Sequence, residues 1–123
     1  MEKQILDKGA QITIDEIQEW EKSFVKKKGI LEQEETATKI AVCKLTEEVG
    51  EVAKALLESK WNEIQAEVAD VIVFACKIAN IAEKFHNSEN LTSVIRKKLG
   101  YCEGRTYDSA SKKFDKPKSE EFK

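Results

Sequence analysis

This chain of 123 residues contains few residues that break helices, with one proline and five glycines. A composition that is 41% hydrophobic and 36% charged, with so few breakers, is typical of a soluble helical domain. The formal net charge is only −2, which gives no electrostatic basis for general binding to nucleic acids or membrane surfaces. No apolar run approaches the ~20 residues of a membrane-spanning helix. The N-terminus lacks the apolar core of a signal peptide.

Cysteines are also scarce, and they follow no pairing motif. The three are Cys43, Cys76 and Cys102, and no two of them form a CxxC pair. An odd count without such a motif gives no sign of a disulfide framework. Two of the three lie within an apolar helical pattern. We therefore expect reduced, buried thiols in a cytoplasmic protein.

The hydrophobic periodicity predicts four helices. The first begins with a capping box, in which Thr13 is the N-cap and Glu16 the N3 residue, and it ends at Gly29. Its apolar positions repeat at helical spacing and are Ile14, Ile17, Phe24 and Val25. The polar stretch over 30–36 and the segment 86–90 are expected to be loops. The remaining helices are expected at about 38–59, 62–85 and 91–104.

These helices predict an all-α fold, a four-helix bundle-type protomer forming a single domain over residues 1–110. Residues 111–123 are predicted to be a flexible C-terminal tail, because the apolar pattern ends there. The third predicted helix is apolar nearly all round, which favours a central place in the bundle. Val73 and Ile81 lie outside its main apolar stripe. Their positions fit burial against a partner chain, and we expect a homo-oligomer.

Two short acidic runs carry the functional signal, the first with Glu47, Glu48 and Glu51 and the second with Glu67 and Asp70. Spacings of i,i+3 and i,i+4 put such acids on one side of a helix. The second run leads directly into the apolar segment 71–76, where a bare charge is costly to bury. Helical phase places Glu48 and Glu51 along the margin of the buried face, whereas Glu47 points farther away. Two such helices facing each other would form an all-oxygen cage for a hard divalent cation.

An all-carboxylate site suits Mg²⁺ or Mn²⁺ and argues against Zn²⁺. It also argues against a di-iron bundle, which needs Glu-x-x-His pairs, because His86 is the only histidine and lies in a predicted loop. The alternative interpretation is a solvated acidic face, with Lys44 and Lys54 paired to neighbouring glutamates across a turn. Asp70 favours the metal interpretation, since aspartate is a poor residue inside a helix.

Together the two runs resemble the motifs of the MazG-type all-α nucleoside triphosphate pyrophosphohydrolases. The matching residues are Leu45-Thr-Glu-Glu-Val-Gly-Glu51 and Glu67-Val-Ala-Asp70, which give EExxE, a spacer and ExxD. The resemblance covers about residues 13–107. It implies that the protein hydrolyses a (deoxy)nucleoside triphosphate to the monophosphate and pyrophosphate. It also implies a role in nucleotide-pool cleaning and assembly as a homodimer or homotetramer.

The resemblance further implies roles for single residues. By this match Mg²⁺, with Mn²⁺ as a substitute, is bound by Glu48, Glu51, Glu67 and Asp70. Glu47 matches the first glutamate of the motif, which in some members is proposed to orient or deprotonate the attacking water. In-line attack at the α-phosphorus then separates the two products, with the metal clamping the charge.

Farther along the chain, the resemblance extends to Lys98, Arg105 and the nearby aromatic Tyr107, while Cys102 replaces an asparagine that is usual in the family. Lys98 and Arg105 are thereby implied to bind the β- and γ-phosphates. The alternative is a basic last turn of a helix, stabilised by the helix dipole. Trp61 could stack on a nucleobase, although aromatic residues at helical spacing more often belong to the core.

Two other functions stay open. One is a related enzyme with the same carboxylates, such as a dUTP/dCTP or phosphoribosyl-ATP pyrophosphohydrolase. The other is a non-catalytic helical oligomerisation or adaptor protein, in which the acids form salt bridges. In each case we expect neither nucleic acid nor membrane as a partner.

Overall fold

The computed structural model describes residues 5–30 and 33–115 of the chain. They divide into two compact units, one ending at Ser88 and one beginning at Glu89, and each unit is described by itself. The first unit contains three helices, which are α1 (Ile14–Lys27), α2 (Glu34–Leu57) and α3 (Trp61–His86).

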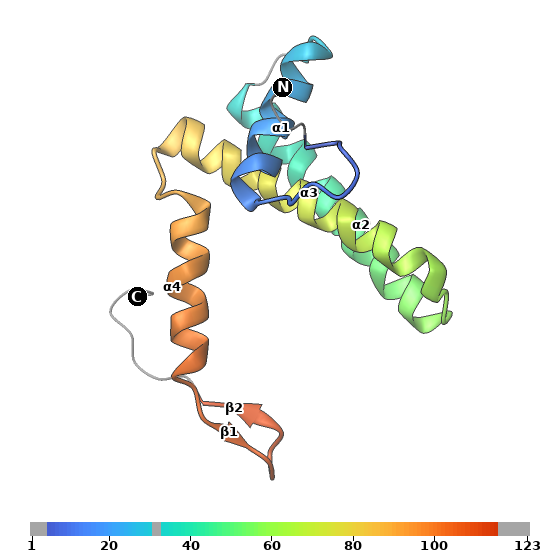
Figure 1. Ribbon diagram of the computed structural model, residues 1–123, viewed down its shortest axis with the longest axis vertical. Helices are drawn as coiled ribbons and strands as arrows, with labels where there is room; N and C mark the ends of the chain where they lie inside the picture. The colour runs from blue at the N-terminus through green and yellow to red at the C-terminus, as the bar shows by residue number, and fades with distance from the viewer. Residues whose placement is uncertain (1–4, 31–32, 116–123) are drawn as a thin grey trace. The chain divides into compact units, whose positions relative to one another are not determined.

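The second unit contains one helix and a small hairpin (Figure 1). Its elements are α4 (Leu91–Glu103), β1 (Tyr107–Asp108) and β2 (Lys113–Phe114). The prediction of four helices in a mostly helical protein is confirmed. The predicted boundaries of the third and fourth helices differ from the observed ones by about a residue, which is within the usual uncertainty of helix ends.

α1 begins as the sequence predicts. The Thr13 hydroxyl accepts a hydrogen bond from the Glu16 N–H at 3.1 Å, and the Glu16 carboxylate accepts one from the Thr13 N–H at 2.9 Å. This capping box satisfies two donors that have no partner inside the helix. Beyond the last turn Gly29 adopts a φ of 70°, a left-handed conformation that glycine reaches without steric cost.

α2 begins at Glu34, so the predicted loop over 30–36 is wrong at its C-terminal end. Glu34 and Glu35 lie in the first turn, where negative charge interacts favourably with the helix dipole. Lys39 pairs with Glu35 one turn later at 3.0 Å. The N-cap residue, Gln33, makes no side-chain capping bond, so the usual sequence signal for a helix start is missing.

A short turn reverses the chain between α2 and α3. Ser59 adopts a φ of 55°, and the Lys60 N–H donates to the Ala55 carbonyl at 2.9 Å. This bond closes α2 as in a Schellman motif, with serine at the left-handed position where glycine is usual. α2 and α3 therefore run antiparallel beside each other (Figure 1). Residues equally distant from Ser59 lie at similar levels along such a helical hairpin.

The apolar core lies between α2 and α3. Ala37 and Ala41 of α2 are buried with Ile81 of α3, and Ile78 and Phe85 pack against them. The prediction that Ile81 faces a partner chain is therefore wrong, because this side chain lies opposite the first turns of α2.

The most buried side chains of α1, where it packs on α3, are polar. Gln18 and Glu21 are buried, whereas Phe24, which the pattern placed on the buried face, is 39% exposed. Gln18 Nε2 donates to Asn80 Oδ1 at 3.0 Å, and Asn80 Nδ2 donates to Glu21 Oε1 at 2.7 Å. Lys77 Nζ donates to the other oxygen of Glu21 at 3.2 Å. Burial of the Glu21 charge is tolerated because it is paired and hydrogen-bonded.

The structure corrects two further predictions in detail. His86 is the last residue of α3 rather than part of a loop, and its Nε2 pairs with a carboxylate oxygen of Glu34. All three cysteines are free thiols as predicted, but only Cys76 is buried, while Cys43 and Cys102 are exposed. Apolar neighbours in sequence did not ensure burial, because those two thiols lie on outward-facing sides of α2 and α4.

In the second unit, the side chain of Asn90 caps the first turn of α4. The hairpin after α4 is antiparallel, with Tyr107 opposite Phe114 and Asp108 opposite Lys113. The sequence pattern did not predict these strands, and β2 falls within the predicted tail. Residues 116–123 of that predicted tail lie outside the described residues.

The single domain over residues 1–110 stays a prediction. In the part of the chain that the structure describes, every helix is too short or too polar to cross a membrane.

Candidate metal centre

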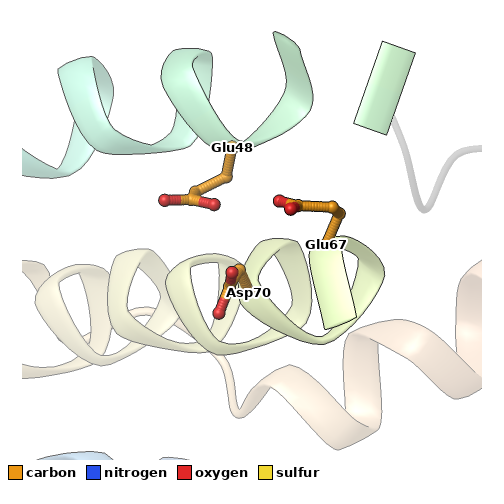
Figure 2. Close-up of side chains that lie close together, drawn as sticks. All are labelled: Glu48, Glu67 and Asp70. Carbon is orange, nitrogen blue, oxygen red and sulfur yellow. The ribbon is translucent and has the colours of Figure 1, made fainter. Parts of the chain in front are cut away.

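Three acidic side chains converge where α2 and α3 face each other. Glu48 projects from α2, and Glu67 and Asp70 project from α3 (Figure 2). One carboxylate oxygen from each residue lies within 4.8 Å of the other two. Glu48 and Glu67 are half-buried, and Asp70 is exposed. The cluster is therefore set into the helix pair and remains open to solvent.

The position of the turn accounts for this convergence. Glu48 and Asp70 are each eleven residues from Ser59, so the antiparallel pair brings them to the same level. Glu67 precedes Asp70 by three residues and therefore lies on the same side of α3. The two acidic motifs meet because they are placed symmetrically about the turn.

Negative charges crowd Glu48. Partial burial raises the pKa of the Glu48 carboxyl above its usual range, and the nearby charges of Asp70, Glu47 and Glu67 raise this pKa further. Lys44 acts in the opposite direction but less strongly. Among the residues that the structure describes, no ion pair involves any of the three clustered carboxylates. A divalent cation would offset this repulsion, so the cluster fits a ligand set better than an ion-pair network.

The other two predicted site residues of α2 lie outside this group. Glu47 is exposed and pairs with Lys44 at 3.5 Å, which is the type of contact that a solvated acidic face predicts. Glu51 is exposed, one turn closer than Glu48 to the end of α2, and at the level of Glu67 across the hairpin. The structure thus brings together three of the four predicted metal ligands.

The predicted substrate-binding residues belong to both units. Trp61 is the first residue of α3 and is 66% exposed. Lys98, Arg105 and Tyr107 belong to the second unit and are described within it. There Lys98 Nζ lies 5.2 Å from the centroid of the Tyr101 ring, and Tyr107 is about half exposed.

Arg105 is bound to the hairpin that the sequence pattern did not reveal. Its Nε donates to the Asp115 carbonyl at 2.6 Å, and its guanidinium carbon lies 5.3 Å from the centroid of the Phe114 ring. The rings of Phe114 and Tyr107 are 5.0 Å apart across the two strands. The available signal was the turn chemistry that begins at Asp108, since aspartate and serine favour such turns.

The donor set of the cluster points to a hard cation. All three donors are carboxylate oxygens, which suit Mg²⁺ or Mn²⁺. Mg²⁺ usually keeps several waters and is held by a few carboxylates together with substrate phosphates. A cation in such a site can neutralise phosphate charge and lower the pKa of a bound water.

The chain also matches a known protein family. The family model described as MazG nucleotide pyrophosphohydrolase domain matches residues 33–105, which is more than half of the chain. The matched segment includes α2, α3 and α4, and with them the three clustered carboxylates. No curated protein and no solved structure matches the chain in the corresponding searches.

Proposed function

The chain belongs to the MazG nucleotide pyrophosphohydrolase family, and we propose that it hydrolyses a nucleoside triphosphate to the monophosphate and pyrophosphate in the presence of Mg²⁺. The observation that supports this proposal is the cluster of Glu48, Glu67 and Asp70, with an oxygen of each within 4.8 Å of the others. Family membership alone indicates nucleotide pyrophosphohydrolase activity. The cluster adds a place where a cation and a phosphate chain can meet.

In the proposed reaction, the oxygen of a water molecule attacks the α-phosphorus in line with the leaving group. The bond between this phosphorus and the oxygen that bridges to the β-phosphorus breaks, and pyrophosphate leaves with that oxygen. Bound Mg²⁺ supplies neutralisation of the phosphate charge. Glu47 is proposed to orient the water and accept its proton, because it matches the first glutamate of the EExxE motif and its charge lies close enough to Glu48 to raise the pKa of that carboxyl.

Four residues are proposed to hold the metal. Glu48, Glu67 and Asp70 are already together, and their mutual repulsion favours a cation between them. Glu51 is proposed as the fourth ligand because it lies level with Glu67 across the helical hairpin. Its exposed side chain has the rotational freedom to turn toward the cluster.

Four further residues are proposed to bind parts of the substrate, and they are Lys98, Arg105 and Tyr107 of the second unit and Trp61 of the first. Lys98 and Arg105 would bind phosphate oxygens, Arg105 through its planar set of donors. Tyr107 and the exposed Trp61 offer aromatic faces for a nucleobase. Nucleotide-pool cleaning in the cytoplasm is the proposed role, and the free cysteines fit a reducing compartment.

A homodimer or homotetramer is the proposed assembly. Large apolar side chains stay exposed along α2 and α3, among them Val49 at 50%, Leu56 at 49% and Ile72 at 41%. Large apolar side chains exposed on helices are the kind of surface that a subunit interface covers. Light scattering during size-exclusion chromatography measures the number of subunits, and a monomer at all concentrations would contradict this part of the proposal.

The test of the activity measures pyrophosphate release from a panel of nucleoside triphosphates, with Mg²⁺, with Mn²⁺ and with EDTA. The panel includes dUTP and dCTP, and phosphoribosyl-ATP is assayed beside it, because these separate the related enzymes. We expect release that needs a divalent cation and falls by at least about a hundredfold in Glu48→Gln and Asp70→Asn, as for loss of a group acting on the transition state.

Glu35→Gln is the matched control. Glu35 is an exposed acid on the same helix as Glu48, and it pairs with Lys39 away from the cluster. This variant should keep wild-type activity. If the wild type releases no pyrophosphate and its melting temperature does not change with millimolar Mg²⁺, the proposal fails and a non-catalytic adaptor becomes the better interpretation. Release of single phosphates instead of pyrophosphate would show a different reaction.

A further inference from the structure

In the second unit, the guanidinium of Arg105 is held by the main chain of the hairpin. Its Nε donates to the Asp115 carbonyl at 2.6 Å, and its Nη2 lies 3.5 Å from the Phe114 carbonyl, at the long limit of a hydrogen bond. The Phe114 ring lies over the same group, with its centroid 5.3 Å from the guanidinium carbon. Arginine has five N–H donors, so these two bonds leave donors available for an anion.

The hairpin is stabilised next to Arg105 by reciprocal bonds. The Asp115 N–H donates to the Thr106 carbonyl at 2.9 Å, and the Asp115 carboxylate accepts from the Thr106 N–H at 2.7 Å. At the turn, the two carboxylate oxygens of Asp108 accept from the Ala110 N–H and from the Ser111 hydroxyl. A hairpin of two-residue strands is marginal without such bonds. The Asp115 side chain therefore controls the position of the carbonyl that binds Arg105.

Two cationic side chains of this unit meet at one aromatic ring. Lys98 Nζ lies 5.2 Å from the centroid of Tyr101, and the guanidinium carbon of Arg105 lies 5.9 Å from it. Lys98 and Tyr101 both come from α4, whereas Arg105 follows the helix and could turn away from it. The hairpin contacts oppose this movement, so they keep the guanidinium beside the same Tyr101 ring that Lys98 approaches.

We propose that the hairpin is a positioning element for phosphate binding, in which Asp115 fixes Arg105 so that its remaining N–H donors act together with Lys98 on the phosphate chain of the substrate. This inference rests on the proposed function. Asp115 is a positioning residue that acts through Arg105 and does not itself touch the substrate. A guanidinium that is already held loses less freedom when the anion binds.

If electrostatics alone mattered, removal of Asp115 would increase the affinity for anions rather than decrease it. Asp115→Ala deletes a negative charge beside Arg105, which by itself would strengthen anion binding. If positioning matters, binding weakens instead, because the Thr106 N–H loses its acceptor and the carbonyl that holds Arg105 is released. Asp115→Asn deletes the same charge but keeps a side-chain oxygen that can accept from Thr106. The two variants thus separate charge from position.

The experiment measures KM and kcat for the preferred nucleotide, and the Kd of inorganic tripolyphosphate by calorimetry. Asp115→Ala should raise both KM and this Kd by roughly tenfold, the scale of losing one preorganised interaction, with kcat within about twofold. Asp115→Asn should match or exceed the wild type in affinity. In an Arg105→Lys background, Asp115→Ala should have little further effect, since the residue through which it acts is gone. Glu103→Ala is the control for removal of one exposed negative charge from the same unit.

The Arg105 Nε–H signal in ¹H–¹⁵N NMR spectra gives a readout that does not depend on catalysis. We expect a slowly exchanging signal in the wild type and in Asp115→Asn, and loss of it in Asp115→Ala. Phe114→Leu keeps the carbonyl but removes the ring, and should weaken tripolyphosphate binding less than Asp115→Ala does. If Asp115→Ala does not fold, Phe114→Leu takes its place as the test, and the expected loss of affinity for tripolyphosphate is then smaller.

The outcomes distinguish this inference from the proposed function. If the wild type turns over no nucleotide but tripolyphosphate binding and the Nε–H signal change as expected, the positioning inference holds and the proposed activity fails. If the wild type is active but Asp115→Ala binds tripolyphosphate as well as or better than the wild type, the hairpin does not position Arg105. Absence of tripolyphosphate binding to the wild type also overturns the inference.

Discussion

Replacing Asn80 with alanine should remove the central member of the polar network between α1 and α3. Its Oδ1 accepts from Gln18 Nε2 at 3.0 Å, and its Nδ2 donates to the Gln18 carbonyl at 3.1 Å and to Glu21 Oε1 at 2.7 Å. Asn80 and Glu21 are each only 6% exposed, so water has little access to replace these bonds. The variant would leave the Glu21 carboxylate buried with Lys77 as its remaining donor in this network.

The size of the expected decrease in the free energy of unfolding follows from these three bonds. Each of the two neutral hydrogen bonds contributes about 1 kcal/mol to the free energy of unfolding, and the bond to a carboxylate about 1.5–3 kcal/mol. Alanine is the better helix former by roughly half a kcal/mol, which offsets a small part of the loss. The expected decrease is therefore about 3–4.5 kcal/mol. For a chain of this length each kcal/mol lowers the melting temperature by about 4 °C, so we expect a fall of roughly 12–18 °C.

Urea denaturation followed by circular dichroism, at one protein concentration and in EDTA, measures this free energy. Glu19→Ala is the control, because Glu19 lies on α1, the other helix of the network, but is exposed and forms only an i,i+3 pair with Lys22 at 3.2 Å. Such a surface pair is worth less than about 0.5 kcal/mol, so the control should hardly change stability. A loss below about 1 kcal/mol in Asn80→Ala would refute the reasoning, because it would mean that the network is solvated or easily replaced.

Three further predictions concern charge and burial. Iodoacetamide at mildly alkaline pH should alkylate the two exposed cysteines quickly and Cys76 slowly, because burial, with a smaller contribution from Glu21, raises the pKa of the Cys76 thiol. Mass spectrometry counts the labels on each molecule, and fast labelling of all three cysteines would contradict this prediction. The pKa of Asp108 is lowered, mainly by the hydrogen bond from the Ser111 hydroxyl. The contribution of Asp108 to hairpin stability should therefore be present above the pKa of about 4 in the unfolded chain, and be lost as the pH falls through the lower pKa of the folded chain. NMR titration of the Asp108 carboxyl carbon measures this pKa, and a midpoint above about 4 would refute the prediction. Glu48→Gln removes one of the crowded like charges, so the melting temperature of this variant in EDTA should exceed that of the wild type, and its increase with Mg²⁺ should be smaller. A melting temperature in EDTA below that of the wild type would contradict the repulsion between these carboxylates.

Local signals in the sequence predicted much of the helical fold. The capping box at Thr13 and Glu16 contains its own hydrogen-bond partners, so the sequence pattern alone is enough to locate it. The start of α2 has no such signal, because Gln33 makes no side-chain cap and the first turn depends on charge and on tertiary packing of Ala37. The hairpin was missed since strands of two residues carry too little alternation to show a period.

The buried face of α1 shows a different limit to what the sequence can predict. Apolar residues at helical spacing predict the buried face, so the sequence of α1 predicts burial of Phe24 and not of Gln18 or Glu21. The actual face is set by partners 56–65 residues away on α3, which supply hydrogen bonds to those polar side chains. No spacing rule within α1 contains that information, because the compensation is tertiary.

The sequence spacing predicts only one half of the geometry of the candidate site. Spacing of i,i+3 predicts that Glu67 and Asp70 share a side of α3, but it does not predict which residues of α2 face them. That choice is made by the turn at Ser59, whose left-handed conformation in a non-glycine residue gives only a weak sequence signal. Once the turn is placed, Glu48 falls opposite Asp70, and Glu51 falls opposite Glu67. Whether a fourth carboxylate joins the cluster then depends on a side-chain rotation, which the charge of a bound cation would favour and which helix geometry leaves open.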